Sequence, residues 1–138
     1  MTLGASDIRN YIVKDAVYPK KGSLLTIQSA DGKVDLTAAT EVCMLVALDE
    51  SSRDADGTLV AASATVAAIP IGGVLMVAAN GGETWTPGDL IYAGADGQAT
   101  STAGSNKKIG IYVAEQTGNI TTVEGDLYPV NTNSAVDA

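Results

Sequence analysis

The side chains that most often carry catalysis are scarce in this chain, which has one cysteine and no histidine. Without histidine, neither a Ser–His–Asp triad nor a Cys–His pair can form, and a zinc site lacks its usual ligands. Cys43 lies within an apolar run and is expected to act as a small buried side chain. The pair Gly32-Lys33 lacks the preceding glycine and the following Ser or Thr of a phosphate-binding loop. The sequence therefore predicts no catalytic, cofactor-binding or metal site.

One acidic loop, residues 52–57, resembles half of a calcium-binding loop. Ser52 occupies the position of the first acidic ligand, and Ser63 stands where a bidentate Glu is required. A solvated turn is therefore the favoured interpretation. Paired carboxylates for glycoside hydrolysis stay open as an alternative, because their spacing is set by the fold. An enzyme of that kind is the least favoured class of function.

The charge balance and the apolar composition both bear on partners. The chain has 8 basic and 16 acidic residues, a net charge of −8, so a nucleic-acid partner is not expected. Hydrophobic residues make up 46% of the chain, but Phe is absent and aromatics total 4%. A core of small aliphatic side chains buries little area per residue. This composition predicts association with copies of the chain or with a larger surface.

The segment 58–82 has no charged residue and is long enough to cross a bilayer. Pro70 and the pair Gly72-Gly73 divide it into pieces of strand length, so we expect buried strands and no membrane partner. Residues 1–7 lack the basic start and apolar run of a secretory signal.

The strongest pattern in the chain is an internal repeat. One unit runs from Gly22 to Ala47 and the other from Gly88 to Ala114. Each contains a strand that follows a glycine, an Ala-Asp-Gly turn and a closing apolar strand that ends in Val-Ala. The spacing between these landmarks is almost the same in the two units, and small insertions account for the differences. Such self-similarity is typical of a duplicated building block.

Short strands between turns predict an all-β fold, a small barrel or sandwich built from two similar β-units. We expect strands within 24–28, 34–37, 42–48, 66–71, 73–78, 85–115 and 120–130. The run 42–48 is expected to be buried on both faces, and Pro70 is expected to place its strand at a sheet edge or in an irregular stretch. No helix with a clear 3.6-residue period is expected.

The two ends of the chain differ from its centre. Residues 1–18 are predicted to form an extended N-terminal arm, residues 19–130 the barrel or sandwich domain, and residues 131–138 a flexible tail. The stretch 8–18 fits either an edge strand or an arm that becomes ordered on a partner, and we favour the arm. The side chains expected to contact that partner are Ile8, Arg9, Tyr11, Ile12, Val13 and Tyr18.

Trp85 is the one indole of the chain. Two interpretations stay open: it plugs an end of the barrel, or it anchors a contact between subunits, where Trp is enriched. In the second interpretation Tyr92 is expected to join it.

The second unit carries a resemblance to a known family. The segments 86–92, 96–97 and 108–115 resemble the signature of small tailed-phage capsid decoration proteins of the DUF2190 type, also called head cement proteins. Residues 71–74 resemble an element that precedes this signature. The first unit departs from it, because Ser23 replaces the Asp and Cys43 stands where the second unit has Gly110.

This resemblance implies a structural virion protein without enzymatic activity, made in the cytoplasm of the host bacterium. Such a protein binds the outer surface of an icosahedral capsid, often as a homotrimer, and stabilises the shell by bridging capsomers. The implied partner is the major capsid protein, and the arm is expected to lie on it. The alternative is a receptor- or glycan-binding β-module of a phage tail fibre or surface layer, which would share the Thr-, Gly- and Ala-rich composition.

Overall fold

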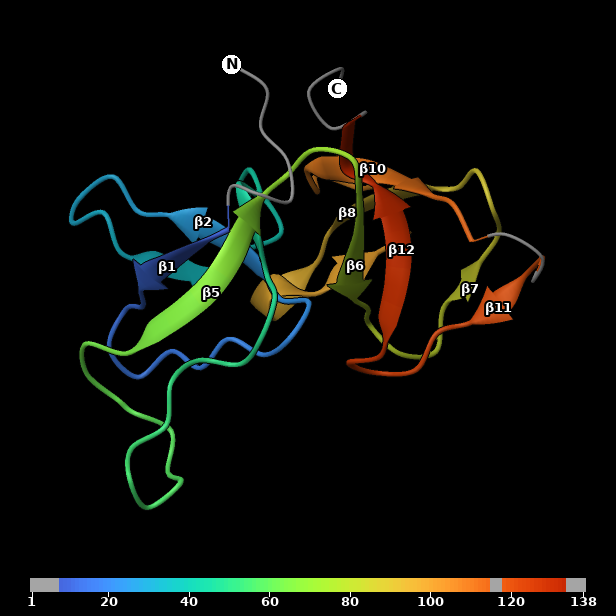
Figure 1. The fold of residues 1–138 in the computed structure, drawn as a ribbon. Coiled ribbons are helices and arrows are strands. Elements are labelled where there is room, and N and C mark those ends of the chain that lie inside the picture. The colour runs from blue at the N-terminus through green and yellow to red at the C-terminus, as the bar shows by residue number, and fades with distance from the viewer. Residues whose placement is uncertain (1–7, 115–117, 134–138) are drawn as a thin grey trace.

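The computed structural model describes residues 8–114 and 118–133, and this part of the chain is all-β. Figure 1 shows the arrangement of its strands and of one short 3₁₀ turn, η2 (Ala95–Gly97). The strands are β1 (Arg9–Ile12), β2 (Leu24–Ile27), β3 (Val34–Leu36), β4 (Leu45–Ala47), β5 (Thr65–Pro70), β6 (Val74–Ala78), β7 (Thr84–Trp85), β8 (Leu90–Ala93), β9 (Ala99–Thr100), β10 (Lys108–Tyr112), β11 (Ile120–Thr121) and β12 (Leu127–Asn131).

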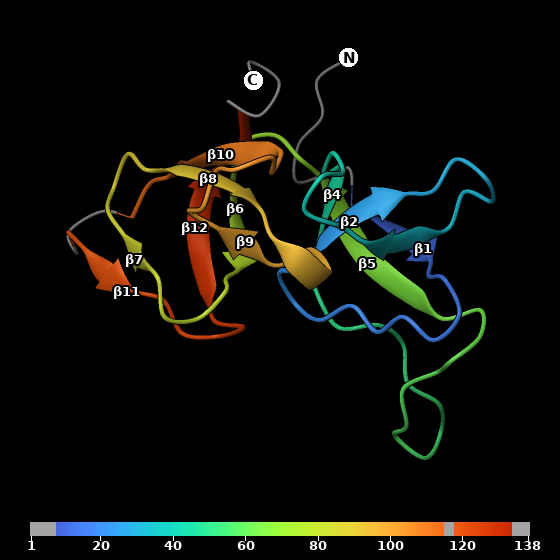
Figure 2. The ribbon, with the colours of Figure 1, turned by 180° about the vertical axis from the view of Figure 1, so that it is seen from behind.

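The strands form two five-stranded antiparallel sheets and a small ribbon. The first sheet has the order β1-β5-β4-β2-β3, and the second has the order β6-β12-β10-β8-β9. Strands β7 and β11 pair with each other. Figures 1 and 2 show the two sheets side by side, with the ribbon on the side of the second sheet that faces away from the first.

Each sheet curls until its first and last strands meet. A parallel bridge joins Val13, just after β1, to Val34 of β3, and the Lys14 N–H donates to the Val34 carbonyl at 2.9 Å. An equivalent bridge joins Ala79, just after β6, to Ala99 of β9. The first sheet is called barrel one (residues 9–70) and the second barrel two (residues 74–131). The predicted all-β fold of two similar units is confirmed.

The duplication covers whole barrels and is larger than the sequence pattern indicated. In sheet order, β1, β5, β4, β2 and β3 correspond to β6, β12, β10, β8 and β9. Leu24 pairs with Val46, and Leu90, which holds the position of Leu24 in barrel two, pairs with Ile111. Val46 therefore corresponds to Ile111, and not to Val113 as the repeated Val-Ala indicated. A slip of two positions leaves every side chain on the same face of a strand, because side chains alternate.

The run 42–48 is only half buried, in contrast to the prediction. Leu45, Val46 and Ala47 form β4 and are all buried, whereas Val42 and Met44 precede the strand and are exposed. Val46 is buried because the apolar cluster of barrel two covers the outer face of β4, and this cover does not extend to Val42 and Met44. Sequence pattern alone does not show how far such a cover extends.

The prediction of an edge strand at Pro70 is wrong. Strand β5 lies between β1 and β4, and Pro70 is its last residue. Its partner on β4 is Leu45, whereas the pairing with β1 ends at Ala68. The ring nitrogen therefore removes no hydrogen bond from the β1–β5 ladder, and a proline is tolerated at this strand end.

The residues next to both predicted boundaries belong to the barrels. Residues 9–12 of the predicted arm are edge strand β1, and Val13 is fully buried in barrel one. Thr132 of the predicted tail is also buried; its N–H donates to the Gly73 carbonyl at 2.8 Å. Residues 9–12 therefore form the edge strand that was the alternative to an arm. Thr132 belongs to barrel two, so the predicted tail boundary at residue 131 lies too far toward the N-terminus. Residues 1–7 and 134–138 of the predicted arm and tail lie outside the described residues.

The two barrels share part of their cores. The interior of barrel one is aliphatic: Val13, Leu25, Val34, Leu45, Ala47, Ala64, Val66 and Ala68. A second cluster fills barrel two, and it includes Leu24, Cys43, Val46 and Ile69 from the outer face of barrel one. Because outward side chains of one barrel are buried against the other, the pair forms one packed body.

Glycines allow the two backbones to approach closely at this interface. The Ala78 N–H donates to the Gly22 carbonyl at 2.9 Å, and a Cβ at Gly22 would lie 2.8 Å from that nitrogen. On the other side, the Gly97 N–H donates to the Thr37 carbonyl at 2.9 Å. Gly97 has φ +73°, and a Cβ there would lie 2.9 Å from the Leu24 oxygen. Both positions therefore require glycine.

Candidate functional site

Among the described residues, the Glu83 carboxylate accepts several hydrogen bonds that hold the fold together. Glu83 accepts hydrogen bonds from Trp85 Nε1 at 2.8 Å and from the Ser101 N–H at 2.8 Å, and also from the Thr100 hydroxyl. Burial alone would raise the pKa of Glu83, but hydrogen bonds from Thr100, Trp85 and Ser101 together lower it. A carboxylate that accepts these hydrogen bonds is favoured in its ionised form, and its oxygens are already bonded within the fold. It fastens the β7–β11 ribbon to β9.

The Cys43 thiol is buried in an apolar setting. Cys43 is buried, and its sulfur donates to the Leu45 carbonyl at 3.3 Å. Burial raises the pKa of the thiol to about 11. The thiolate is the reactive form of cysteine, so burial and a raised pKa disfavour reaction at this thiol. Cys43 is a small buried side chain, as predicted, and it belongs to the cluster shared by the two barrels.

The acidic loop between β4 and β5 projects from barrel one, as the green loop at the bottom of Figure 1 shows. Its charged groups bond within the loop itself. Arg53 pairs with Glu50 at 2.7 Å and donates to the Gly57 carbonyl, while the Asp54 side chain accepts from the Asp56 and Thr58 N–H groups. Within residues 8–114 and 118–133 no cluster of three or more acidic, Cys or His side chains could hold a metal ion.

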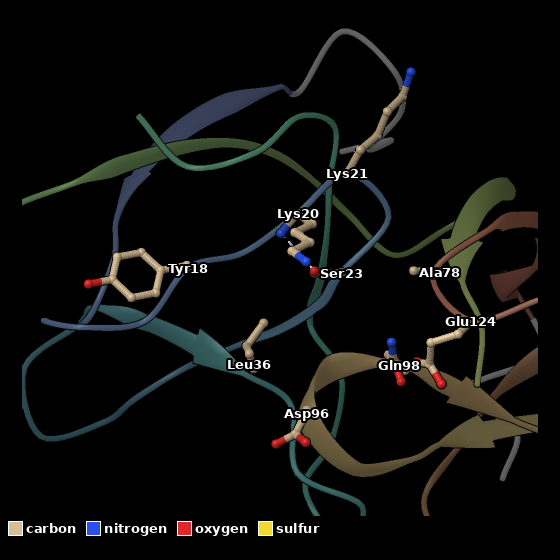
Figure 3. Close-up of a pocket in the computed structure, with 10 residues that line it drawn as sticks. Tyr18, Lys20, Lys21, Ser23, Leu36, Ala78, Asp96, Gln98 and Glu124 are labelled. Atoms are coloured by element: carbon tan, nitrogen blue, oxygen red, sulfur yellow. Dashed lines mark hydrogen bonds between the residues drawn. The ribbon is translucent and has the colours of Figure 1, made fainter. Parts of the chain in front are cut away.

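A polar cleft of about 300 Å³ lies where the barrels meet. Figure 3 shows Lys20 and Ser23 on the barrel-one side, with Asp96, Gln98 and Glu124 on the barrel-two side. The one hydrogen bond drawn there joins the Lys20 N–H to the Ser23 hydroxyl at 2.9 Å, which is a local turn contact. The lining mixes charges of both signs and has no nucleophile–base pair, so it has no evident catalytic geometry.

An apolar groove of about 310 Å³ lies at another part of the same junction. Its lining includes Ile8, Leu48, Val74, Leu75, Met76 and Leu127, with Lys21 at the edge. About half of the Ile8, Val74 and Met76 side chains is exposed to solvent. Contiguous exposed apolar surface of this kind is typical of a site where another protein binds.

The structure separates the side chains that the sequence offered as contact residues. Ile8 lines the apolar groove, Tyr18 lines the polar cleft, and Arg9 and Ile12 are exposed on β1. Two of the predicted contact residues face inward: Val13 is fully buried, and Tyr11 packs against the core of barrel one.

Of the two residues predicted to contact another subunit, Trp85 is buried and Tyr92 is partly exposed. Trp85 has no exposed surface, because its ring packs between Tyr112 and Tyr128 with centroid distances of 5.5 Å. In this conformation Trp85 cannot touch a second subunit. Tyr92 is half-buried on β8, where it pairs with Lys108 and Thr100.

The groove residues of β6 were missed by the sequence analysis, although a signal was present. The strand Val74–Ala78 is apolar at every position, so both of its faces carry apolar side chains. An edge strand with one face in water normally alternates polar and apolar residues. The lack of alternation in β6 leaves the apolar side chains of Val74 and Met76 exposed.

The described residues form two packed barrels, and apolar side chains gather on the surface where the barrels meet. Within the described part of the chain, no helix is long and apolar enough to cross a membrane.

A family model for phage cement proteins matches residues 27–127, more than half of the chain and parts of both barrels. The chain therefore belongs to the phage cement protein family, and its role is that of a structural, capsid-associated protein of the virion. No curated protein matches the sequence.

Proposed function

We propose that this protein binds the outer surface of an icosahedral phage capsid and stabilises the shell by bridging neighbouring capsomers. The observation that carries the proposal is the family match over residues 27–127. The partner is the major capsid protein, and the protein acts as a homotrimer without enzymatic activity.

The charge of the chain supports the outer surface over the inner one. With a net charge of −8, the protein would be repelled by packaged DNA, whose phosphates line the inside of a filled head. An acidic protein on the outside meets no such repulsion.

The apolar groove is the proposed contact with the capsid protein. It lies between the barrels, so an apolar segment seated there touches both halves of the chain at once. Ile8 and Met76 provide exposed apolar surface at its opening, and Lys21 provides a positive charge at its edge. The groove therefore suits an apolar segment flanked by an acidic residue.

Reinforcement follows from repetition. One small interface contributes modest free energy, but a ligand that binds only the assembled shell stabilises that shell by mass action. Many identical contacts on one head raise the temperature at which the head ruptures.

Binding to undecorated heads tests the proposal. We expect Met76→Glu and Ile8→Glu each to weaken binding at least about tenfold, because a buried carboxylate would have to lose its hydration. Val123→Glu, at an exposed apolar residue outside the groove, is the matched control and should bind normally. Co-sedimentation with heads measures affinity, and thermal release of DNA measures reinforcement. If both groove variants bind like the control, the groove is not the contact. If the wild-type protein does not bind heads, the function itself is wrong.

A further inference from the structure

Strand β6 contributes one edge of its backbone to the apolar groove. Among the described residues, β12 is the one strand that pairs along β6, which lies at the end of its sheet. The other long side of β6 faces barrel one, as Figures 1 and 2 show. Val74, Leu75 and Met76 of β6 line the groove together with residues of barrel one. One wall of the groove is therefore the free edge of a strand.

The register between β6 and β12 shows which backbone groups point to that edge. In an antiparallel pair, only every second residue exchanges hydrogen bonds with its partner. The Thr132 N–H donates to the Gly73 carbonyl, and the Ala79 N–H donates to the Asp126 carbonyl. Both pairs continue the β6–β12 register, so the odd-numbered residues of β6 bond to β12. The N–H and C=O groups of its even-numbered residues point to the free edge.

One end of this edge is already paired with barrel one. The Ala78 N–H donates to the Gly22 carbonyl at 2.9 Å. Met76 and Val74 follow along the same edge. Within residues 8–114 and 118–133, no strand pairs with their outward N–H and C=O groups. These groups are therefore available to a further strand.

The side chains of β6 do not protect this edge. Natural proteins protect exposed edges with charged residues, proline or a bulge, whereas β6 reads Val-Leu-Met-Val-Ala. In barrel one, the equivalent edge strand β1 carries exposed Arg9 and Asn10. Val74 and Met76 are 59% and 48% exposed. An unprotected apolar edge of this kind is a template for an added strand.

We propose that an extended segment of the major capsid protein adds to the free edge of β6 as a sixth strand of this five-stranded sheet. Its backbone bonds to Met76 and Val74, and its apolar side chains at alternate positions pack beside theirs. The added strand extends the backbone contact that Gly22 begins at Ala78. The inference rests on the proposed function for the partner and deepens it by naming the mode of binding.

The lining of the groove defines the chemistry of the segment. Lys21 is the one charged residue among the described residues that line it, and the other lining residues are apolar. The segment that fits has apolar residues at alternate positions and an acidic residue at the end that lies near Lys21.

Proline at residue 76 separates strand addition from contact through side chains. Met76→Ala and Met76→Pro both remove the thioether side chain, but only proline also removes the outward N–H. The β6–β12 ladder loses no hydrogen bond in either variant, because the Met76 N–H points away from β12. In co-sedimentation with undecorated heads, we expect Met76→Pro to bind at least about tenfold more weakly than Met76→Ala, since a buried acceptor of the added strand loses its donor.

Barrel one offers a matched control at Asn10. Strand β1 holds the place of β6 in its sheet. The Val13 N–H donates to the Ala64 carbonyl in register with the β1–β5 pairs, so the N–H of Asn10, three residues earlier, points away from β5. Asn10 does not line the groove. Asn10→Pro and Asn10→Ala should therefore bind heads equally well. Far-UV circular dichroism and urea midpoints establish that each variant is folded.

Hydrogen exchange of the wild type tests the same contact without any substitution. The amides of Val74 and Met76 should exchange more slowly on heads than in the free protein. Those of Leu75 and Val77 are already bonded to β12 and should change little. Mass spectrometry with residue-level fragmentation measures the difference.

The possible outcomes separate this contact from the proposed function. Equal binding of Met76→Pro and Met76→Ala, or unchanged exchange of the Val74 and Met76 amides on heads, would overturn strand addition while the protein still binds heads. Sedimentation velocity of the free protein examines a second copy as the occupant. An assembly that Met76→Pro dissociates and Met76→Ala leaves intact would also overturn the proposal. A wild type that does not bind heads would overturn the proposed function and this inference together.

Discussion

The two barrels have the same strand order and register but fill their interiors differently. Barrel one has Ala47 and Val66 where barrel two has Tyr112 and Tyr128, and only barrel two receives Trp85 from a separate ribbon. Barrel two has Gly110 at the position of Leu45, and a Cβ there would lie 2.8 Å from the Val130 side chain. The comparison shows that the same arrangement of strands can be filled by different side chains. Where one position carries a larger side chain, a facing position carries a smaller one, as close packing requires.

The connections differ as well. Between β4 and β5, barrel one has the projecting loop 48–64, whereas the matching connection in barrel two contains β11. Strand β11 pairs with β7, which lies in the connection from β6 to β8. Only barrel two therefore has a ribbon that carries a large side chain into its core.

The largest expected effect comes from removing the aromatic filling. Trp85→Ala should lower the free energy of unfolding by about 3–5 kcal/mol, and the matched change in barrel one, Leu25→Ala, by about 2–5 kcal/mol. Because Leu24 and Val46 join the two cores, both variants should unfold in one transition. Urea unfolding followed by far-UV circular dichroism measures this. Two separate transitions would show that the barrels are independent.

The two Asp-Gly turns provide a matched pair of glycines that measures the close contact between the barrels. Gly97 and Gly32 occupy equivalent turns with φ +73° and +72°, but only Gly97 has close neighbours. Gly32→Ala should cost about 1–2 kcal/mol for the left-handed backbone. Gly97→Ala should cost that amount plus about 1–3 kcal/mol for crowding Leu24 and Leu36. Equal losses of stability in the two variants would contradict the close approach seen here.

Glu83, in barrel two, should make the free energy of unfolding depend on pH. Its pKa is lowered in the folded chain, so its contribution is present above the ordinary glutamate pKa of about 4.3 and is lost as the pH falls through the folded value. Glu83→Gln should lose about 1–3 kcal/mol at neutral pH, and its stability should fall less steeply in acid. Urea midpoints at a series of pH values measure both effects. An unchanged acid slope in Glu83→Gln would exclude this carboxylate as the cause.

The smallest perturbation is labelling of the native Cys43 thiol, which tests whether the two barrels separate before they unfold. Because Cys43 is buried and the pKa of its thiol is raised to about 11, a thiol reagent at mildly alkaline pH should label it only after unfolding. Labelling should therefore follow the urea transition seen by circular dichroism. Labelling at lower urea would mean that the barrels separate before they unfold.

The fold could be predicted from local patterns to a useful extent. Asp31-Gly32 and Asp96-Gly97 marked turns correctly because Asp-Gly favours positive φ, and the repeat around them marked two similar units. The correspondence of β1 with β6 and of β5 with β12 has no sequence signal. Those strands share only their place in the sheet, where cross-strand pairing and not residue identity defines the position.

The binding surfaces could be predicted less well. Of the residues predicted to contact a partner, Ile8 is exposed, whereas Val13 and Trp85 are buried. Apolar residues in an edge strand look alike in sequence whether they face a core or a partner. Which face is buried depends on the neighbouring barrel, and no local period records that neighbour.

The projecting loop 48–64 has a practical consequence. Its base is fixed because the Leu48 N–H donates to the Ala67 carbonyl at 2.9 Å and the Ser52 N–H donates to the Thr65 carbonyl at 2.8 Å, while Ala55 and Asp56 at its tip are exposed. Lengthening a loop costs only about 0.6 kcal/mol for each doubling of its length. A foreign epitope inserted at the tip should therefore leave both cores intact and turn every bound copy into a carrier of displayed peptide.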